Sequence, residues 1–213
     1  MGVSKEENYQ GNNRIFCLRV QNIPLIHLFH GRIDDMKRLV PDEVVLGLLK
    51  YQSSHGYELL KWFNSHEYLG RIWTMSTSQI YAVLKRLEEL GTIVGEEIST
   101  QNAPNRVEYH ITKFGEDRLL AWLYKSKPSA SIHRIRVEFI SRLFIAELIE
   151  LPKSEIILSQ KQAVERVLGK LDAQKASTQS STEQLTLTFV VGQLKTALKW
   201  LDTCENYDLK TAE

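Results

Sequence analysis

Apolar residues recur every three or four positions between residues 76 and 90, which is the period of an α-helix with one buried face. These positions are Ile80, Val83, Leu84, Leu87 and Leu90. Ser76 and Gln79 have the spacing of a capping box, and Gly91 is suited to a left-handed helix end. The pattern predicts a capped amphipathic helix that starts at Ser76 and stops before Gly91.

Shorter patterns flank this helix. Apolar runs predict helices over 42–51 and 56–63, the second capped by Ser54. Two strand-like runs, 93–98 and 106–111, enclose a polar loop. Thr112 then caps another helix, with apolar residues Phe114, Leu119, Leu120, Trp122 and Leu123. Short helices followed by a β-hairpin outline a winged helix-turn-helix over 39–125, a fold that usually binds duplex DNA.

The polar face of the central helix carries candidate DNA contacts. Short polar side chains come first and cations follow, which suits a helix that reads base edges with its first turns and touches phosphates further along. On this helix the candidates are Ser76, Ser78, Gln79, Tyr81, Lys85 and Arg86, the last two as phosphate contacts. The helix before it and the hairpin add Ser54, His55, Tyr57, Asn105 and Arg106, with Arg106 expected in the minor groove. The conservative alternative is a helix whose polar face meets only water.

Several motifs occur in a fixed order along this region. They are Leu46-Gly47-Leu48-Leu49, His55-Gly56-Tyr57-Glu58-Leu59, Trp73, Ser78-Gln79-Ile80-Tyr81, Leu84-Lys85-Arg86-Leu87-Glu88-Glu89-Leu90-Gly91, Pro104-x-Arg106 and Tyr109-His110-Ile111-Thr112-x-x-Gly115. Together they resemble the PadR family of bacterial transcriptional regulators over about residues 39–125. Further on, Ile135-Arg136-Val137-Glu138-Phe139 is similar to the start of the C-terminal domain in virulence-activator-like members, with Val137 replacing the usual acid. The resemblance implies a DNA-binding regulator, either a repressor or an activator.

Residues 131–213 predict a helical domain that follows a linker at Ser126–Ser129. Its three helices are expected over 132–151, 154–174 and 183–207. In the last helix, apolar residues alternate steps of four and three as in a coiled coil: Leu187, Val191, Leu194, Leu198 and Leu201. We interpret this seam as the homodimer interface, because two half-sites of an inverted repeat are read only when two copies are held at a fixed separation. The alternative is a helix packed within its own chain.

Composition narrows the functional classes. The net charge is +1, and residues 1–125 hold 15 Lys/Arg and 15 Asp/Glu, so this part of the chain is not strongly basic and DNA affinity must come from a few well-placed cations. The same balance leaves open a winged module that binds protein instead of DNA. The chain has no apolar run long enough to span a membrane and no secretory signal, and a cytoplasmic location is expected.

Enzymatic chemistry is not expected, and neither is a cofactor or a metal. Ser53-Ser54-His55 could be imagined as nucleophile and base, but adjacent residues rarely face each other and no orienting acid follows. His27 and His30 have metal-ligand spacing without a third ligand nearby. Cys17 and Cys204 follow no redox or metal pattern.

Aromatic residues are frequent for a small domain, which suggests a small aromatic effector. Some PadR proteins bind flat ligands between their two modules and then release DNA; the alternative is that Trp73 and Trp122 belong to the core. Thr77 occupies the place where phenolic-acid-responsive members carry a histidine, so the resemblance does not extend to a phenolic-acid response. Residues 1–38 have no counterpart in the family and are expected to be a partly disordered N-terminal extension.

Overall fold

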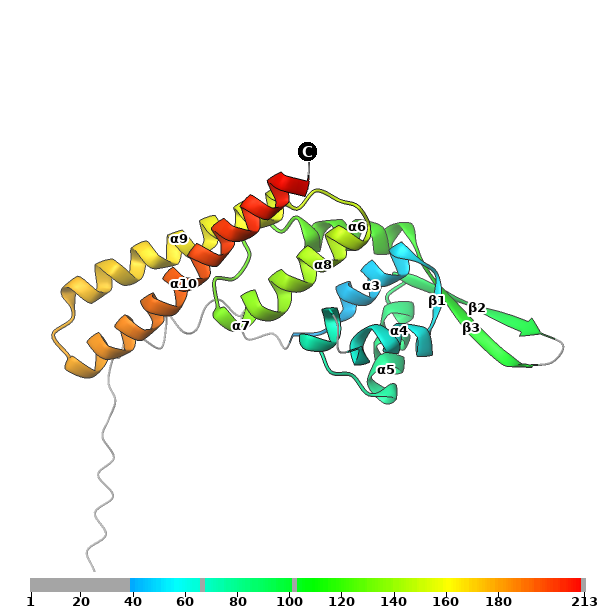
Figure 1. The fold of residues 1–213 in the computed structure, drawn as a ribbon. Helices are drawn as coiled ribbons and strands as arrows, with labels where there is room; N and C mark the ends of the chain where they lie inside the picture. Colours follow the sequence, from blue (N-terminus) through cyan, green and yellow to red (C-terminus); the bar gives the residue numbers. More distant parts are fainter. Residues whose placement is uncertain (1–38, 66–67, 101–102, 212–213) are drawn as a thin grey trace, which may run out of the picture. The chain divides into compact units, whose positions relative to one another are not determined.

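The computed structural model describes residues 39–65, 68–100 and 103–211, which all belong to one unit, Lys37–Glu213 (Figure 1). The first part consists of α3 (Asp42–Tyr51), β1 (Ser54–His55), α4 (Gly56–Asn64), the 3-10 helix η1 (Tyr68–Arg71), α5 (Thr77–Glu89), β2 (Ile93–Thr100), β3 (Ala103–Ile111) and α6 (Lys113–Leu123). The second part consists of α7 (Ile132–Arg134), the π-helical segment η2 (Ile135–Phe139), α8 (Ile140–Leu148), α9 (Ser154–Ser177) and α10 (Ser181–Thr211). The predicted fold class, mainly helical with a small β-wing, is confirmed.

The described strands form one antiparallel sheet in the order β1-β3-β2. β2 and β3 make the predicted hairpin, which we call the wing, with Ile93 opposite Ile111 at its base. β1 was not predicted, because two residues carry no periodicity. It pairs Ser54 with Tyr109 and His55 with Glu108, so the segment before α4 is hydrogen-bonded to the wing.

The core of the winged region comes from the predicted apolar faces. Val45, Leu46 and Leu49 of α3 are buried, and so are Ile80 and Leu84 of α5. Leu90 was predicted on the same face but is half exposed. The reason is that α5 ends at Glu89, and Gly91 then adopts a positive φ of 66° that turns the chain toward β2.

Thr112 caps α6 as predicted, because its hydroxyl accepts a hydrogen bond from the Gly115 amide. A Cβ at Gly115 would lie 2.1 Å from the Thr92 carbonyl oxygen, so only glycine allows this approach. Of the apolar residues in α6, Leu119 and Leu123 are buried, whereas Phe114 and Leu120 are exposed.

The second part is made of the three predicted helices, with one irregularity. Residues 132–148 form a continuous helical segment whose first turns are π-helical at Ile135–Phe139, which periodicity did not indicate. This segment packs on the winged region: a Cβ at Gly47 of α3 would lie 2.4 Å from Ile145 of α8. The predicted domain boundary between residues 39–125 and 131–213 therefore lies inside one compact unit, Lys37–Glu213, and the division into two domains stays a prediction.

The predicted dimer seam is corrected by the structure. α9 and α10 form a hairpin in which the two helices lie side by side, α10 shown in red and orange (Figure 1). Leu187, Val191, Leu194 and Leu201 are buried within this single chain, and Leu198 is half-buried. A regular apolar stripe packs against the nearest complementary helix, and here α9 of the same chain supplies Ile157, Val164, Leu168 and Leu171.

Some predictions fall outside the described residues. These are the N-terminal extension 1–38, the His27/His30 pair and Cys17. Within the described ranges, Cys204 is a free thiol and His, Cys, Asp and Glu side chains make no group of three suited to a metal ion. In those same ranges, every helix is too short or too polar to traverse a bilayer.

Candidate nucleic-acid interface

The N-terminus of α5 is held by the predicted capping box. The Ser76 hydroxyl accepts a hydrogen bond from the Gln79 amide at 3.3 Å, and the Ser76 amide donates to Gln79 Oε1 at 2.8 Å. Ser76 and Ser78 are also joined through their hydroxyls at 3.0 Å. These bonds satisfy amides that a helix start leaves unpaired, so the first turn is preorganised.

The capping box limits what Gln79 offers to a ligand. Its carbonyl oxygen is engaged by Ser76, so the side-chain NH2 group remains as its donor. The side chains of Ser76, Thr77, Ser78 and Gln79 are all exposed. The first turn of α5 is therefore a rigid, uncovered surface of hydroxyl and amide groups, as the sequence predicted.

Tyr81 and Lys85 extend this surface along α5. Tyr81 is about half exposed, and its ring lies over Gly56, where a Cβ would come within 2.9 Å of it. The glycine at the start of α4 thus leaves room for the ring. Lys85 lies 3.9 Å from Glu89, and both side chains are well exposed, so this ion pair is weak and leaves the ammonium available.

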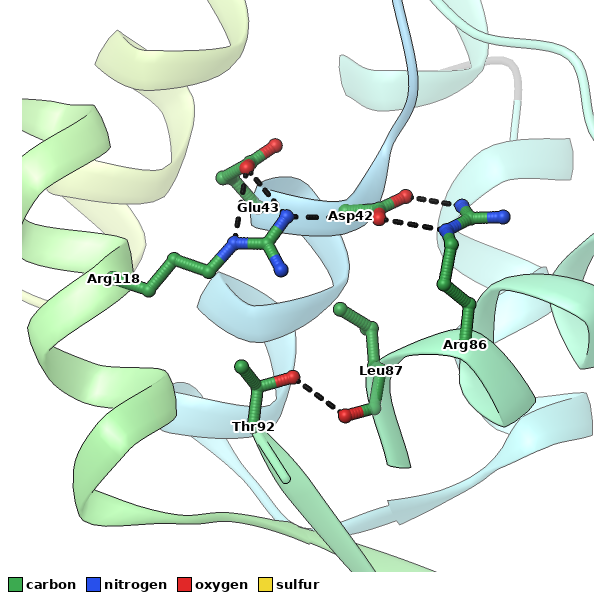
Figure 2. Close-up of polar contacts among 6 residues, drawn as sticks. All are labelled: Asp42, Glu43, Arg86, Leu87, Thr92 and Arg118. Atoms are coloured by element: carbon green, nitrogen blue, oxygen red, sulfur yellow. Dashed lines mark hydrogen bonds and ion pairs between the residues drawn. The ribbon is translucent and has the colours of Figure 1, made fainter. Parts of the chain in front are cut away.

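Arg86 differs from Lys85, although the sequence analysis treated the two alike. Its guanidinium donates from Nε to Asp42 Oδ2 at 2.9 Å and from Nη2 to Asp42 Oδ1 (Figure 2). The hydrogen bond to Asp42 raises the pKa of Arg86, outweighing the lowering by burial. The structure therefore shows a partner within the chain where a phosphate contact was expected.

The residues before α4 lie near this surface but in other roles than predicted. The N-cap of α4 is His55, not Ser54, because the His55 amide donates to Glu58 Oε2 at 3.2 Å. Ser54 belongs to β1 and donates its hydroxyl to the Gln52 carbonyl. The His55 ring donates from Nδ1 to the Val107 carbonyl at 2.8 Å, which fixes the ring against the wing.

Tyr57 is exposed on α4, with the Lys61 ammonium 4.3 Å from its ring centroid. Such cation–π packing positions the lysine over the ring. Lys61 was missed by the sequence analysis. Its spacing of four from Tyr57 on a predicted helix is a signal that could have identified it.

The wing combines an exposed cation with acidic groups. Arg106 is exposed in β3, whereas the side chain of Asn105 lies outside the described part of the chain. Glu96 and Glu108 are directly opposite each other, which is an unfavourable pair of like charges. His110 Nε2 lies 3.4 Å from Glu108 and 3.8 Å from Glu96, and its Nδ1 is 2.7 Å from the Ser53 hydroxyl.

Comparison with known proteins finds similarity to one family of regulators. Residues 45–121 match the transcriptional regulator PadR-like family. The chain is 25% identical over 169 residues to the negative transcriptional regulator PadR of Bacillus subtilis (strain 168), a match that covers 75% of this chain and 92% of that protein. Residues 45–121 of this chain are therefore a PadR-like domain.

Solved PadR structures are similar over most of the chain. The Bacillus subtilis PadR structure in complex with operator DNA is 23% identical, with a TM-score of 0.41, and the match covers 80% of this chain and 99% of that one. A PadR-like transcriptional regulator from Bacillus cereus is 20% identical, with a TM-score of 0.37 and coverages of 81% and 98%. PadR-like proteins are transcriptional regulators and not enzymes, which confirms the expectation of a protein that is not an enzyme.

Proposed function

We propose that this chain binds duplex DNA as a homodimer on an inverted-repeat operator and regulates transcription. The single observation that carries the proposal is the uncovered first half of α5, where Ser78, Gln79 and Tyr81 are all exposed. Hydroxyl and amide groups held in place at a helix start are the kind of groups that hydrogen-bond to base edges and phosphates. α5 is the recognition helix of this proposal.

The contacts are assigned by position on the interface. Ser78, Gln79 and Tyr81 meet base edges and nearby phosphates, Ser76 caps the helix beside them, and Lys85 binds a phosphate. Ser54, His55 and Tyr57 approach the backbone from the start of α4. Asn105 and Arg106 belong to the wing, from which Arg106 enters the minor groove.

The homodimer uses a face of α10 other than the predicted seam. Leu185 and Phe189 are 73% and 66% exposed, and with Gly192, Thr196 and Trp200 they follow one another at steps of four and three. Phe189, Gly192, Thr196 and Trp200 line an open, mostly apolar groove of about 700 Å³. We assign this face to a second copy of the chain, because a large exposed apolar stripe is costly in solution and an inverted repeat requires two copies.

Two copies set the geometry of the operator. The half-site centres would lie one helical turn of DNA apart, roughly 34–36 Å, or a multiple of that distance. The named relative is a negative regulator, and this likeness supports repression as the regulatory outcome.

A small aromatic effector is the regulatory part of the proposal. Trp73, three residues before the α5 cap, donates its indole N–H to the Ser141 hydroxyl of α8 at 2.9 Å. This bond joins the approach to the recognition helix with the second part of the chain, so a flat ligand that displaced it would alter the position of α5. An effector that does so must shift Trp73 fluorescence and release operator DNA at the same concentrations, whereas release without a fluorescence change contradicts this route.

The decisive experiment begins by selecting operator fragments from random-sequence duplexes with the full chain. Gln79→Ala should relax base preference at one position of each half-site, at a cost of about 1–3 kcal/mol per site. Lys85→Ala should weaken all duplexes alike and reduce the slope of log affinity against log salt concentration by about one unit. If neither variant changes binding to the selected operator, the assignment of α5 to DNA recognition is wrong.

A protein-interaction module remains the second candidate, because one observation favours it. Glu96 and Glu108 place two carboxylates opposite each other on the wing, on a chain whose net charge is only +1. Gel shifts with random duplex over a range of salt concentrations discriminate the two functions. Salt-dependent retardation supports DNA binding, and its absence at low salt supports a protein partner.

A further inference from the structure

The recognition helix is connected to the rest of the winged region by one buried carboxylate. Asp42, the first residue of α3, is only 3% exposed. Both of its oxygens accept hydrogen bonds from Arg86 of α5, and Oδ2 also lies 3.6 Å from Arg118 Nη2 of α6 (Figure 2). Arg118 in turn donates to Glu43 Oε1 at 2.8 and 3.2 Å. Three helices therefore meet at the Asp42 side chain.

Arg86 cannot leave this carboxylate without a large penalty. A buried carboxylate that loses its partner is left as an uncompensated charge, which is much more costly than the loss of an exposed ion pair. Arg118 alone would not replace it, because its closest contacts are to Glu43. If Arg86 moved toward a DNA phosphate, the strong bidentate pair with Asp42 would be lost and only a solvent-exposed contact would be gained.

Arg86 lies near the C-terminal end of α5, so a small tilt of the helix at the Arg86–Asp42 pair would displace the DNA-facing first turn. Arg86 precedes Leu87, whose carbonyl accepts a hydrogen bond from the buried Thr92 hydroxyl at 2.7 Å where the chain turns into the wing. Gln79 lies seven residues earlier, about 10 Å along the axis. A tilt of about 10° at Arg86 would therefore displace Gln79 by roughly 2 Å, more than the geometry of a hydrogen bond to a base tolerates.

We propose that Asp42 positions α5 for base recognition by holding Arg86, and that Arg86 is a positioning residue and not a phosphate contact. The proposal rests on the DNA-binding function proposed above. Lys85 and Arg86 are neighbours in the sequence with different roles. Lys85 binds a DNA phosphate, and Arg86 orients α5.

The test compares operator with random duplex, each over a range of salt concentrations, for Arg86→Gln, Asp42→Asn and the double variant. Arg86→Gln should lower operator affinity about 10-fold or more, as a misplaced base contact does, while affinity for random duplex stays within about twofold. The salt slope should stay that of the wild-type chain. The double variant should bind no more weakly than either single variant, because all three break the same pair.

Two controls accompany these variants. Lys85→Ala must reduce the salt slope by about one unit, which calibrates the loss of a true phosphate contact. Lys50→Gln removes an ion pair of 2.6 Å between α3 and Glu116 of α6 that does not involve α5, and it should leave the ratio of operator to random affinity unchanged. The unfolding midpoint of every variant is measured, and binding is assayed well below it.

Arg86→Lys decides the matter if Asp42→Asn does not fold. Lysine keeps the charge but cannot form the bidentate pair, so positioning predicts a loss of operator preference with an unchanged salt slope. If Arg86 instead contacts a phosphate, Arg86→Lys should bind nearly as well as the wild-type chain. Arg86→Gln should then lose the same affinity for operator and for random duplex, with a smaller salt slope. Either result overturns the inference. Stronger operator binding by Asp42→Asn also overturns it. A wild-type chain that binds no duplex removes the proposed function, and this inference with it.

Discussion

α5 and α10 are both amphipathic helices for which the sequence indicates one contact surface. The structure agrees with this prediction for α5 and differs from it for α10. In α5 the apolar face is buried in the same chain and the polar face is exposed, as predicted. In α10 the stripe predicted to face a second chain is buried against α9, and a different apolar stripe that begins at Leu185 is exposed. α5 has one apolar face, whereas α10 has two.

The difference shows what a periodic pattern specifies. A helix with one apolar face has only one way to bury it, so its exposed side follows directly from the sequence. A helix with two apolar stripes can bury either one within the chain. For α10 the more regular stripe, Leu187 to Leu201, packs on α9, and the broader stripe with Phe189 and Trp200 is left for the proposed partner copy.

The largest expected effect comes from removing a buried leucine in either helix. Leu84→Ala in α5 and Leu201→Ala in α10 should each lower the free energy of unfolding by about 2–5 kcal/mol, because both side chains are fully buried. Urea unfolding measures this loss. Leu158→Ala, at a half-exposed position of α9 outside the proposed dimer stripe, is the control and should cost far less. An effect of Leu201→Ala no larger than that of Leu158→Ala would contradict the intramolecular packing.

Phe189→Glu tests the exposed stripe directly. A charge in the centre of a dimer interface should raise the dissociation constant about 30-fold or more, the equivalent of about 2 kcal/mol, without unfolding the hairpin. Analytical ultracentrifugation over a concentration series measures the dimer, and circular dichroism checks the helices. Gln162→Glu adds the same charge on an exposed position of α9 and should not change the association. An unchanged dimer in Phe189→Glu would place the interface elsewhere.

Ser76→Ala sharpens the comparison at the exposed end of α5. Loss of the cap should lower the free energy of unfolding by about 1 kcal/mol, because the Gln79 amide loses its acceptor. Ser78→Ala removes a hydroxyl that bonds only to Ser76 among the described residues, and it should change stability by less than about 0.5 kcal/mol. Chemical denaturation of both variants checks the order, and equal losses would show that the capping box is not what fixes the first turn.

The smallest expected effect concerns the ion pairs that join α9 to α10. Lys161 lies 2.8 Å from Asp202 and 2.5 Å from Glu205. The hydrogen bond to Asp202 contributes most to raising the pKa of the lysine, and the hydrogen bond to Glu205 raises it further. A raised folded-state pKa gives stability that is complete below the unfolded-state pKa near 10.5 and is lost as the pH rises beyond it. Because both carboxylates are about half exposed, the contribution is about 1 kcal/mol or less.

The measurement is the difference in unfolding free energy between the wild-type chain and Lys161→Gln. The difference should be constant between pH 8 and 10 and shrink above pH 10.5, where the lysine of the unfolded chain loses its proton while the native pair keeps its own. Subtraction of the variant removes the other groups that titrate in this range. A difference that grows with pH would show that the pair does not stabilise the hairpin.

Within the winged region, the features predicted correctly are local ones. The Ser76 capping box, the Gly91 helix end and the Thr112 cap each depend on residues three or four positions apart, so the sequence contains all the information. The features that were missed depend on contacts across the fold. β1 exists only because β3 passes beside it, and the cap of α4 is His55, which pairs with Glu108 of β3, and not Ser54.

The two cations at the end of the polar face show the same limit for the candidate site. Lys85 and Arg86 are indistinguishable as phosphate contacts in the sequence, because both belong to the polar face of the same predicted helix. Asp42 separates them, from a position 44 residues before Arg86. No rule of spacing relates α3 to α5, so the pairing was not available before the helices were packed.

The sequence by itself determined the order of the helices and the wing, which face of α5 is apolar, and the resemblance to the PadR family. Only the tertiary structure decided which stripe of α10 is buried, which of two adjacent cations is held by Asp42, and which residues close the sheet. The physical reason is that helix periods, caps and turns are set by neighbours along the chain. Burial and charge pairing are set instead by whichever distant surface comes into contact.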